Sequence, residues 1–114
     1  MKVVSIDNET IVFEDGTKLC SYHEQDCCES HWLDFEHLQL SDFDGLDFDL
    51  SNDDFFEKIE GYGIALKPTN GHPVRIAGYG SNNGYYTTNL TLVVQKGRTN
   101  TREFDITDCQ VITD

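Results

Sequence analysis

Alternating apolar and polar positions open this chain and predict short antiparallel strands. Val4 and Ile6 alternate with polar neighbours, and a second apolar run, Ile11-Val12-Phe13, follows a polar break. Asp15-Gly16 comes next, and this dipeptide is a strong hairpin signal because a type I′ turn needs positive φ, which glycine accepts. Residues 2–22 therefore predict a β-meander.

The same alternation returns after residue 61 and continues toward the C-terminus. Polar stretches that contain glycine or proline, at 68–71, 80–84 and 97–101, predict turns between successive strands. The positions that mark the strand faces are Tyr62, Ile64, Leu66, Val74, Ile76, Tyr86, Thr88, Leu90, Leu92, Val94, Phe104, Ile106, Cys109 and Val111.

The stretch 31–38 fits two kinds of element. Trp32 and Phe35 have helical spacing, whereas Leu33 and Phe35 have strand spacing. Periodicity does not decide between them, so both alternatives stay open here.

Residues 42–50 alternate with period two but slip in phase at Gly45. This pattern predicts a strand with a bulge or bend at the glycine, with its aspartates facing outward. Residues 51–60 then predict a short helix, because Ser51 can cap it and two aspartates suit the positive end of its dipole. Gly61 is the expected helix end.

These elements predict one α+β domain that spans residues 1–114. It is mostly antiparallel sheet of the meander or sandwich type, with about seven to nine short strands. One or two short helices from the 32–60 region are expected to pack on one face. We find no internal repeat and no linker in the chain.

Composition indicates which residues fill the core and in which compartment the protein is expected. Apolar residues make up 38% of the chain and aromatic residues 11%, so phenylalanine and tyrosine supply core volume that aliphatic residues do not. No apolar run approaches the roughly 18 residues of a membrane span, and the N-terminus lacks the apolar core of a signal peptide. The sequence thus predicts a cytoplasmic protein with reduced cysteines and no membrane partner.

Negative charge is concentrated in one third of the chain. The net charge is −13 overall, with −12 in residues 24–60, −2 in residues 1–23 and +1 in residues 61–114. Such asymmetry argues against direct binding of DNA or RNA, whose phosphates would be repelled. It favours a basic protein partner, a cation, or simple solubility.

An acidic surface for a basic partner is therefore the first candidate site. The carboxylates that would form it are Asp42, Asp44, Asp47, Asp49, Asp53, Asp54 and Glu57. A dense array of this kind can enter a groove that normally holds nucleic acid, which is DNA mimicry. Calcium at the aspartates around Gly45 is an alternative, although the EF-hand ligand spacing is not met.

A histidine- and cysteine-rich segment is the second candidate. His23, Cys27, Cys28 and His31 supply the side chains that bind tetrahedral zinc, so a structural or regulatory metal module is the alternative function. Their spacing differs from that of the usual zinc fingers. A nucleophilic cysteine beside a histidine is a third possibility, but the neighbouring acids would raise the pKa of a thiol. We therefore expect no enzyme activity, and no cofactor other than zinc.

Two segments resemble a family of small, mostly phage- and mobile-element-borne bacterial proteins of unknown function. Its members carry a His-x-Gln-Asp-Cys-Cys-Glu segment, which is present here as residues 23–29, and a Ser-Asn-Gly-Tyr-Tyr segment, which is present with one extra asparagine as residues 81–86. The resemblance implies a prokaryotic, intracellular, viral-type setting and no particular reaction. Together with the charge, it leads us to expect an acidic binding protein that engages a basic host protein through residues 40–60, for example as an anti-defence inhibitor.

Overall fold

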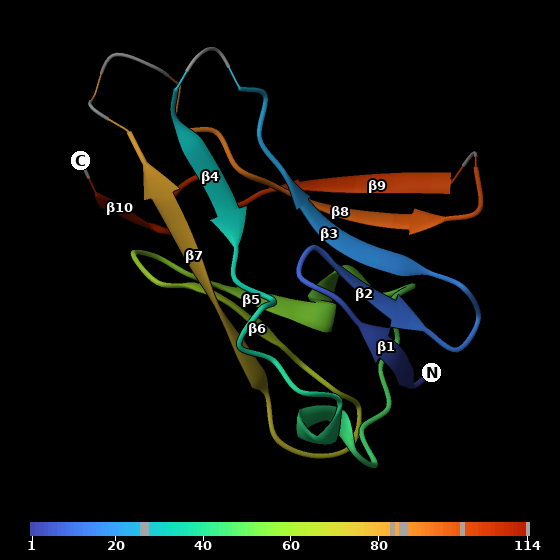
Figure 1. Ribbon diagram of the computed structural model, residues 1–114. Coiled ribbons are helices and arrows are strands. Elements are labelled where there is room, and N and C mark those ends of the chain that lie inside the picture. Colours follow the sequence, from blue (N-terminus) through green and yellow to red (C-terminus); the bar gives the residue numbers. More distant parts are fainter. Residues whose placement is uncertain (26–27, 83, 85–86, 99, 114) are drawn as a thin grey trace.

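Two β-sheets lie face to face and make up most of the molecule (Figure 1). A computed structural model describes residues 1–25, 28–82, 84, 87–98 and 100–113. The first sheet is entirely antiparallel and has the strand order β1-β2-β3-β8-β9. Its strands are β1 (Val3–Ile6), β2 (Thr10–Phe13), β3 (Lys18–Tyr22), β8 (Thr91–Lys96) and β9 (Asn100–Asp105).

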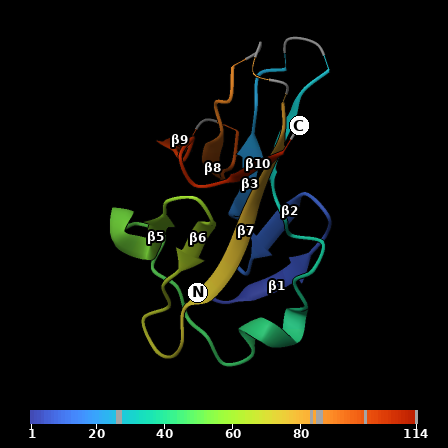
Figure 2. The same cartoon turned by 90° about the vertical axis from the view of Figure 1, so that its left-hand side faces the viewer.

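The second sheet is built around β7, the longest strand. It has the order β10-β7-β6-β5, and β4 also pairs with β7. The members are β4 (Ser30–Leu33), β5 (Phe56–Ile59), β6 (Gly63–Leu66), β7 (Val74–Ser81) and β10 (Val111–Thr113). Only the β10–β7 pair is parallel among the pairs of described residues. Figure 2 shows β7 running along the whole second sheet.

The core lies between the two sheets. Alternate residues of each strand point inward, as in β2, where Ile11 and Phe13 are buried. Residues far apart in the sequence meet here: the rings of Phe13 and Phe48 pack edge to face with centroids 5.8 Å apart. Burying such aromatic side chains is a main source of the folding free energy.

The predicted β-meander at residues 2–22 is confirmed, since β1, β2 and β3 pair in sequence order. The hairpin at Asp15-Gly16 is also present, and the Phe13 N–H donates to the Thr17 carbonyl over 2.8 Å. Its turn is not type I′, however. Gly16 has φ of 88°, but no residue other than glycine has positive φ among the described ones, so Asp15 lacks the second positive φ of that turn.

The α+β prediction is wrong, because the described chain contains no α-helix. The only helical turns in it are two short 3₁₀ helices, η1 (Leu40–Phe43) and η2 (Asp53–Phe55). The expected helix over 51–60 instead becomes η2 followed by β5, which pairs with β6 along its whole length. Pairing to β6 therefore overrides the local helical pattern.

Within residues 31–38, the first three belong to strand β4, and the rest form a turn and irregular structure and not a helix. His31 and Leu33 are buried while Trp32 is exposed, which is the alternation of a half-buried strand. The predicted bent strand over 42–50 is wrong in its pairing, because η1 and an irregular segment replace it. The expected bend at Gly45 is present, with φ of 75°.

Neither of the two 3₁₀ helices in the described residues has the length or the apolar character of a membrane-spanning helix.

Candidate binding surface

The acidic segment, residues 40–60, comprises η1, an irregular stretch, η2 and β5, and it leads from η1 at one end of the molecule to β5 beside β6 in the second sheet (Figure 1). Buried aromatic and aliphatic side chains anchor it along its length: Phe43, Phe48, Leu50, Phe55 and Phe56. The carboxylates between these anchors face outward, as the sequence pattern predicts for Asp47 and Asp49. The acidic segment is thus held to the core while its charged side chains are exposed to solvent.

Only part of this charge is neutralised inside the protein. The Asp53 carboxylate pairs with Arg102 over 2.9 Å, and the Asp47 carboxylate lies 3.5 Å from the N-terminal ammonium. Within the described chain, the remaining predicted carboxylates form no ion pair: Asp42, Asp44, Asp49, Asp54 and Glu57. Most of the predicted binding residues therefore keep an unbalanced negative charge.

Asp49 is held ionised by its own turn. The Ser51 hydroxyl donates to an Asp49 carboxylate oxygen over 2.5 Å, and the Ser51 N–H donates to the same oxygen over 3.1 Å. These two hydrogen bonds lower the pKa of Asp49 below its ordinary value of 3.8, because they favour the charged form. The sequence gives a general signal for this, since aspartate two residues before serine is common in such turns.

Replacing Ser51 by alanine is therefore expected to raise the pKa of Asp49 toward 3.8. The hydroxyl is the larger cause of the lowered pKa, and the backbone N–H remains in the variant. Carboxyl chemical shifts followed by NMR through an acid titration measure the change. Ser41→Ala is the matched control, since the Ser41 hydroxyl bonds to Gln39 and not to Asp49. Equal pKa values for Asp49 in all three proteins would contradict this account.

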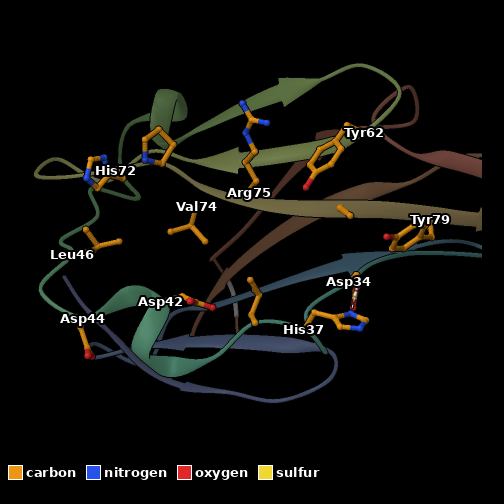
Figure 3. A pocket seen from close by; sticks show the side chains of 13 residues that line it. Asp34, His37, Asp42, Asp44, Leu46, Tyr62, His72, Val74, Arg75 and Tyr79 are labelled. Atoms are coloured by element: carbon orange, nitrogen blue, oxygen red, sulfur yellow. Dashed lines mark hydrogen bonds and ion pairs between the residues drawn. The ribbon is translucent and has the colours of Figure 1, made fainter.

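A groove of about 740 Å³ opens between β7 and the segment that carries η1 (Figure 3). The residues that line it are Asp34, His37, Leu38, Asp42, Asp44, Leu46, Tyr62, His72, Pro73, Val74, Arg75, Ala77 and Tyr79. Figure 3 shows Val74 on β7 facing Asp42 across the opening, while Arg75 points away from Asp42 and Asp44. Two members of the predicted acidic surface thus form one wall of the groove.

The remaining carboxylate of the groove orients a histidine. Nδ1 of His37 lies 2.5 Å from an Asp34 carboxylate oxygen, and the Glu36 N–H donates to the other oxygen over 3.1 Å. His37 itself is exposed. The sequence reasoning missed Asp34, His37 and Tyr79 as groove residues, because strand alternation predicts which face a side chain takes but not which distant segment lies opposite.

The histidine- and cysteine-rich segment forms a buried polar cluster at the other end of the two sheets. The rings of His23 and His31 meet with centroids 4.5 Å apart. Nδ1 of His23 lies 2.6 Å from the Asn89 carbonyl oxygen, and its Nε2 lies 3.2 Å from a carboxylate oxygen of the buried Glu29. Both ring nitrogens of His23 are therefore engaged by other parts of the chain.

His31 is the centre of a chain of directed hydrogen bonds. The Gln110 amide nitrogen donates to the Thr88 and Thr107 carbonyls over 2.7 and 2.8 Å, so its oxygen is left to face His31. Nδ1 of His31 donates to that oxygen over 2.7 Å, and its Nε2 accepts from the Asn82 amide nitrogen over 3.2 Å. This arrangement assigns the proton of a neutral His31 to Nδ1.

The predicted zinc site is brought together only in part. His23 and His31 are adjacent, Cys28 is exposed, and Cys27 lies outside the described residues. Among the residues that the structure does describe, no group of three or more histidine, cysteine or acidic side chains is arranged to hold a metal ion. The metal module stays a prediction, and the hydrogen bonds of both imidazoles give these histidines a structural role.

Two other cysteines have an unreactive environment. Burial raises the pKa of the Cys20 thiol and that of the Cys109 thiol, because a buried thiolate is poorly solvated.

Comparison with protein families finds a match. Residues 1–92 match the profile of a family described as a domain of unknown function, DUF7448. No curated protein and no solved structure matches the chain. The match is consistent with the resemblance to an uncharacterised family, and it assigns no activity.

Proposed function

The chain belongs to the DUF7448 family, a domain family of unknown function, and from its surface we propose that it is a binding module and not an enzyme. It engages the basic surface of another protein through the acidic segment. The observation that carries this proposal is the pattern of anchored aromatic residues and unbalanced carboxylates in residues 40–60. Charge held in place by a packed core steers a basic partner and fixes its orientation.

The setting that we propose is the bacterial cytoplasm, with the gene carried by a phage or mobile element. The partner is then a basic host protein that handles nucleic acid, and the protein acts as an inhibitor, for example an anti-defence protein or a DNA mimic. The net charge of −13 supports this choice, because it favours proteins that normally bind phosphates over nucleic acid itself.

The test compares two variants that each lose four negative charges. The first neutralises carboxylates of the acidic segment that form no ion pair within the described chain: Asp42→Asn, Asp44→Asn, Asp54→Asn and Glu57→Gln. The second neutralises exposed carboxylates elsewhere: Glu9→Gln, Glu24→Gln, Glu103→Gln and Asp108→Asn. A partner retained from a bacterial lysate is purified, and its dissociation constant is measured at low and high ionic strength.

We expect the first variant to weaken binding by about tenfold or more at low ionic strength, and the second by about twofold at most. High ionic strength should shrink the difference, since salt screens exposed charges. Duplex DNA should compete with the protein for the same partner. Equal weakening by both variants would mean that net charge matters and the acidic segment does not.

A further inference from the structure

Strand β7 has one edge that is paired for only half of its length. The Gly78 N–H donates to Tyr62 on the β6 side, whereas the Ala77 carbonyl accepts from the Asp34 N–H on the β4 side. Backbone groups of successive strand residues point to opposite edges. The N–H and carbonyl of Arg75 therefore point to the β4 side, as those of Ala77 do.

Strand β4 does not reach this part of β7. It ends at Leu33, opposite Gly78, and the chain then turns away, with the Phe35 N–H bonded back to the Leu33 carbonyl over 3.2 Å. Among the backbone hydrogen bonds of the described residues, none joins the Arg75 N–H, the Arg75 carbonyl or the Ala77 N–H to a neighbour on this side. An edge of this kind is a template for another strand.

The unpaired edge opens into the groove. Val74, Arg75 and Ala77 line the groove from β7, and Asp42 and Asp44 line the opposite wall (Figure 3). Neither of these aspartates has an ion-pair partner within the described chain. A segment lying along β7 would thus meet backbone donors and an acceptor on one side and negative charge on the other.

We infer that the groove binds an extended, lysine- or arginine-rich segment of a partner protein, which adds to β7 as a strand in line with β4. The inference rests on the proposed function and specifies how the partner is held. Backbone hydrogen bonds to Arg75 and Ala77 supply affinity, and the carboxylates of Asp42 and Asp44 select basic side chains. A helical partner would not satisfy the edge, because its backbone groups bond within the helix.

The probe is a synthetic peptide of alternating lysine and valine, titrated into the whole protein. Two further versions are methylated on the backbone nitrogens of alternate residues, one on the odd-numbered and one on the even-numbered residues. Each version therefore lacks the N–H donors on one edge of the extended peptide. We expect the unmodified peptide to bind and to slow amide hydrogen exchange at Arg75 and Ala77. One methylated version should bind with similar affinity, and the other should lose about fivefold for each hydrogen bond that it cannot make.

A pair of variants tests the same edge from the protein side. Arg75→Pro removes the N–H that faces the groove without removing a bond to β6, while Arg75→Ala keeps this N–H. Both variants remove the same positive charge. We expect Arg75→Pro to weaken peptide binding by about fivefold relative to Arg75→Ala. If the proline variant fails to fold, the methylated peptides still decide the matter with the unaltered protein.

Three results overturn strand addition: equal binding of all peptide versions, unchanged exchange at Arg75 and Ala77, or no binding of the basic peptide. None of them touches the proposed function, which is tested by the charge variants on a folded partner. Conversely, the proposed function would be wrong if the charge variant of the acidic segment bound the folded partner as well as its control does. That result would hold even if an isolated peptide still paired with β7.

Discussion

Replacing Gly63 by alanine is expected to lower the free energy of unfolding by about 3 kcal/mol, the upper end for overpacking a core. Gly63 lies in β6 opposite Ala77 of β7, and a Cβ atom there would overlap the Ile76 carbonyl oxygen. It would also lie 2.8 Å from the Gly78 nitrogen. These neighbours are backbone atoms, so no side-chain rotation relieves the contact and the β6–β7 pair must move apart.

Urea unfolding followed by circular dichroism measures this loss. Gly97→Ala is the control, because nothing lies within 4 Å of a Cβ atom at Gly97, although its φ of 69° makes alanine strained there. The control should lose about 1 kcal/mol, the strain of an L-residue in the left-handed region. If the two variants were equally stable, the close approach of β6 and β7 at Gly63 would have no special cost.

The second large effect is expected at Gln110, where glutamate should lower the free energy of unfolding by about 3 kcal/mol. The change removes the amide donor that bonds to the Thr88 and Thr107 carbonyls. It also leaves a carboxylate in a site that is only 5% exposed. Both carbonyls would then face an acceptor, and the orientation of His31 would lose its support.

Thermal and urea unfolding measure this effect, and Gln95→Glu is the matched control. Gln95 is exposed on β8 opposite Lys18, so the same chemical change should alter stability by about 0.5 kcal/mol at most. The His31 ring protons, observed by NMR, give a second readout. Unchanged stability together with an unchanged His31 spectrum in Gln110→Glu would show that the buried hydrogen bonds do not act as a connected network.

The strands were predictable where alternation and turn residues agree. Residues 2–22 form the expected meander, since short-range pairing of β1, β2 and β3 needs nothing beyond local signals. The 51–60 stretch misled the helix prediction, because capping residues and dipole charges describe an isolated segment. Packing of Phe56 and pairing of β5 with β6 outweigh these small local preferences.

Of the candidate binding surface, only the exposed negative charge could be predicted from the sequence. The exposed position of Asp49 follows from alternation with buried neighbours, which the sequence displays directly. The groove does not follow from it, because Asp42 lies in η1, which packs on β1, whereas Val74 lies in β7 of the second sheet. The polar contacts of His31 with Gln110 were likewise hidden, since no local pattern joins residues 79 positions apart.

The pairing of β3 with β8 determines when the first sheet can form during synthesis of the protein. Cys20 pairs with Val93, so the β3 edge stays unpaired until β8 has left the ribosome. Until then the nascent meander carries a bare β3 edge, which is the kind of surface that captures strands of other chains. A pause in translation before β8 is made would therefore lengthen the time for which this edge is exposed.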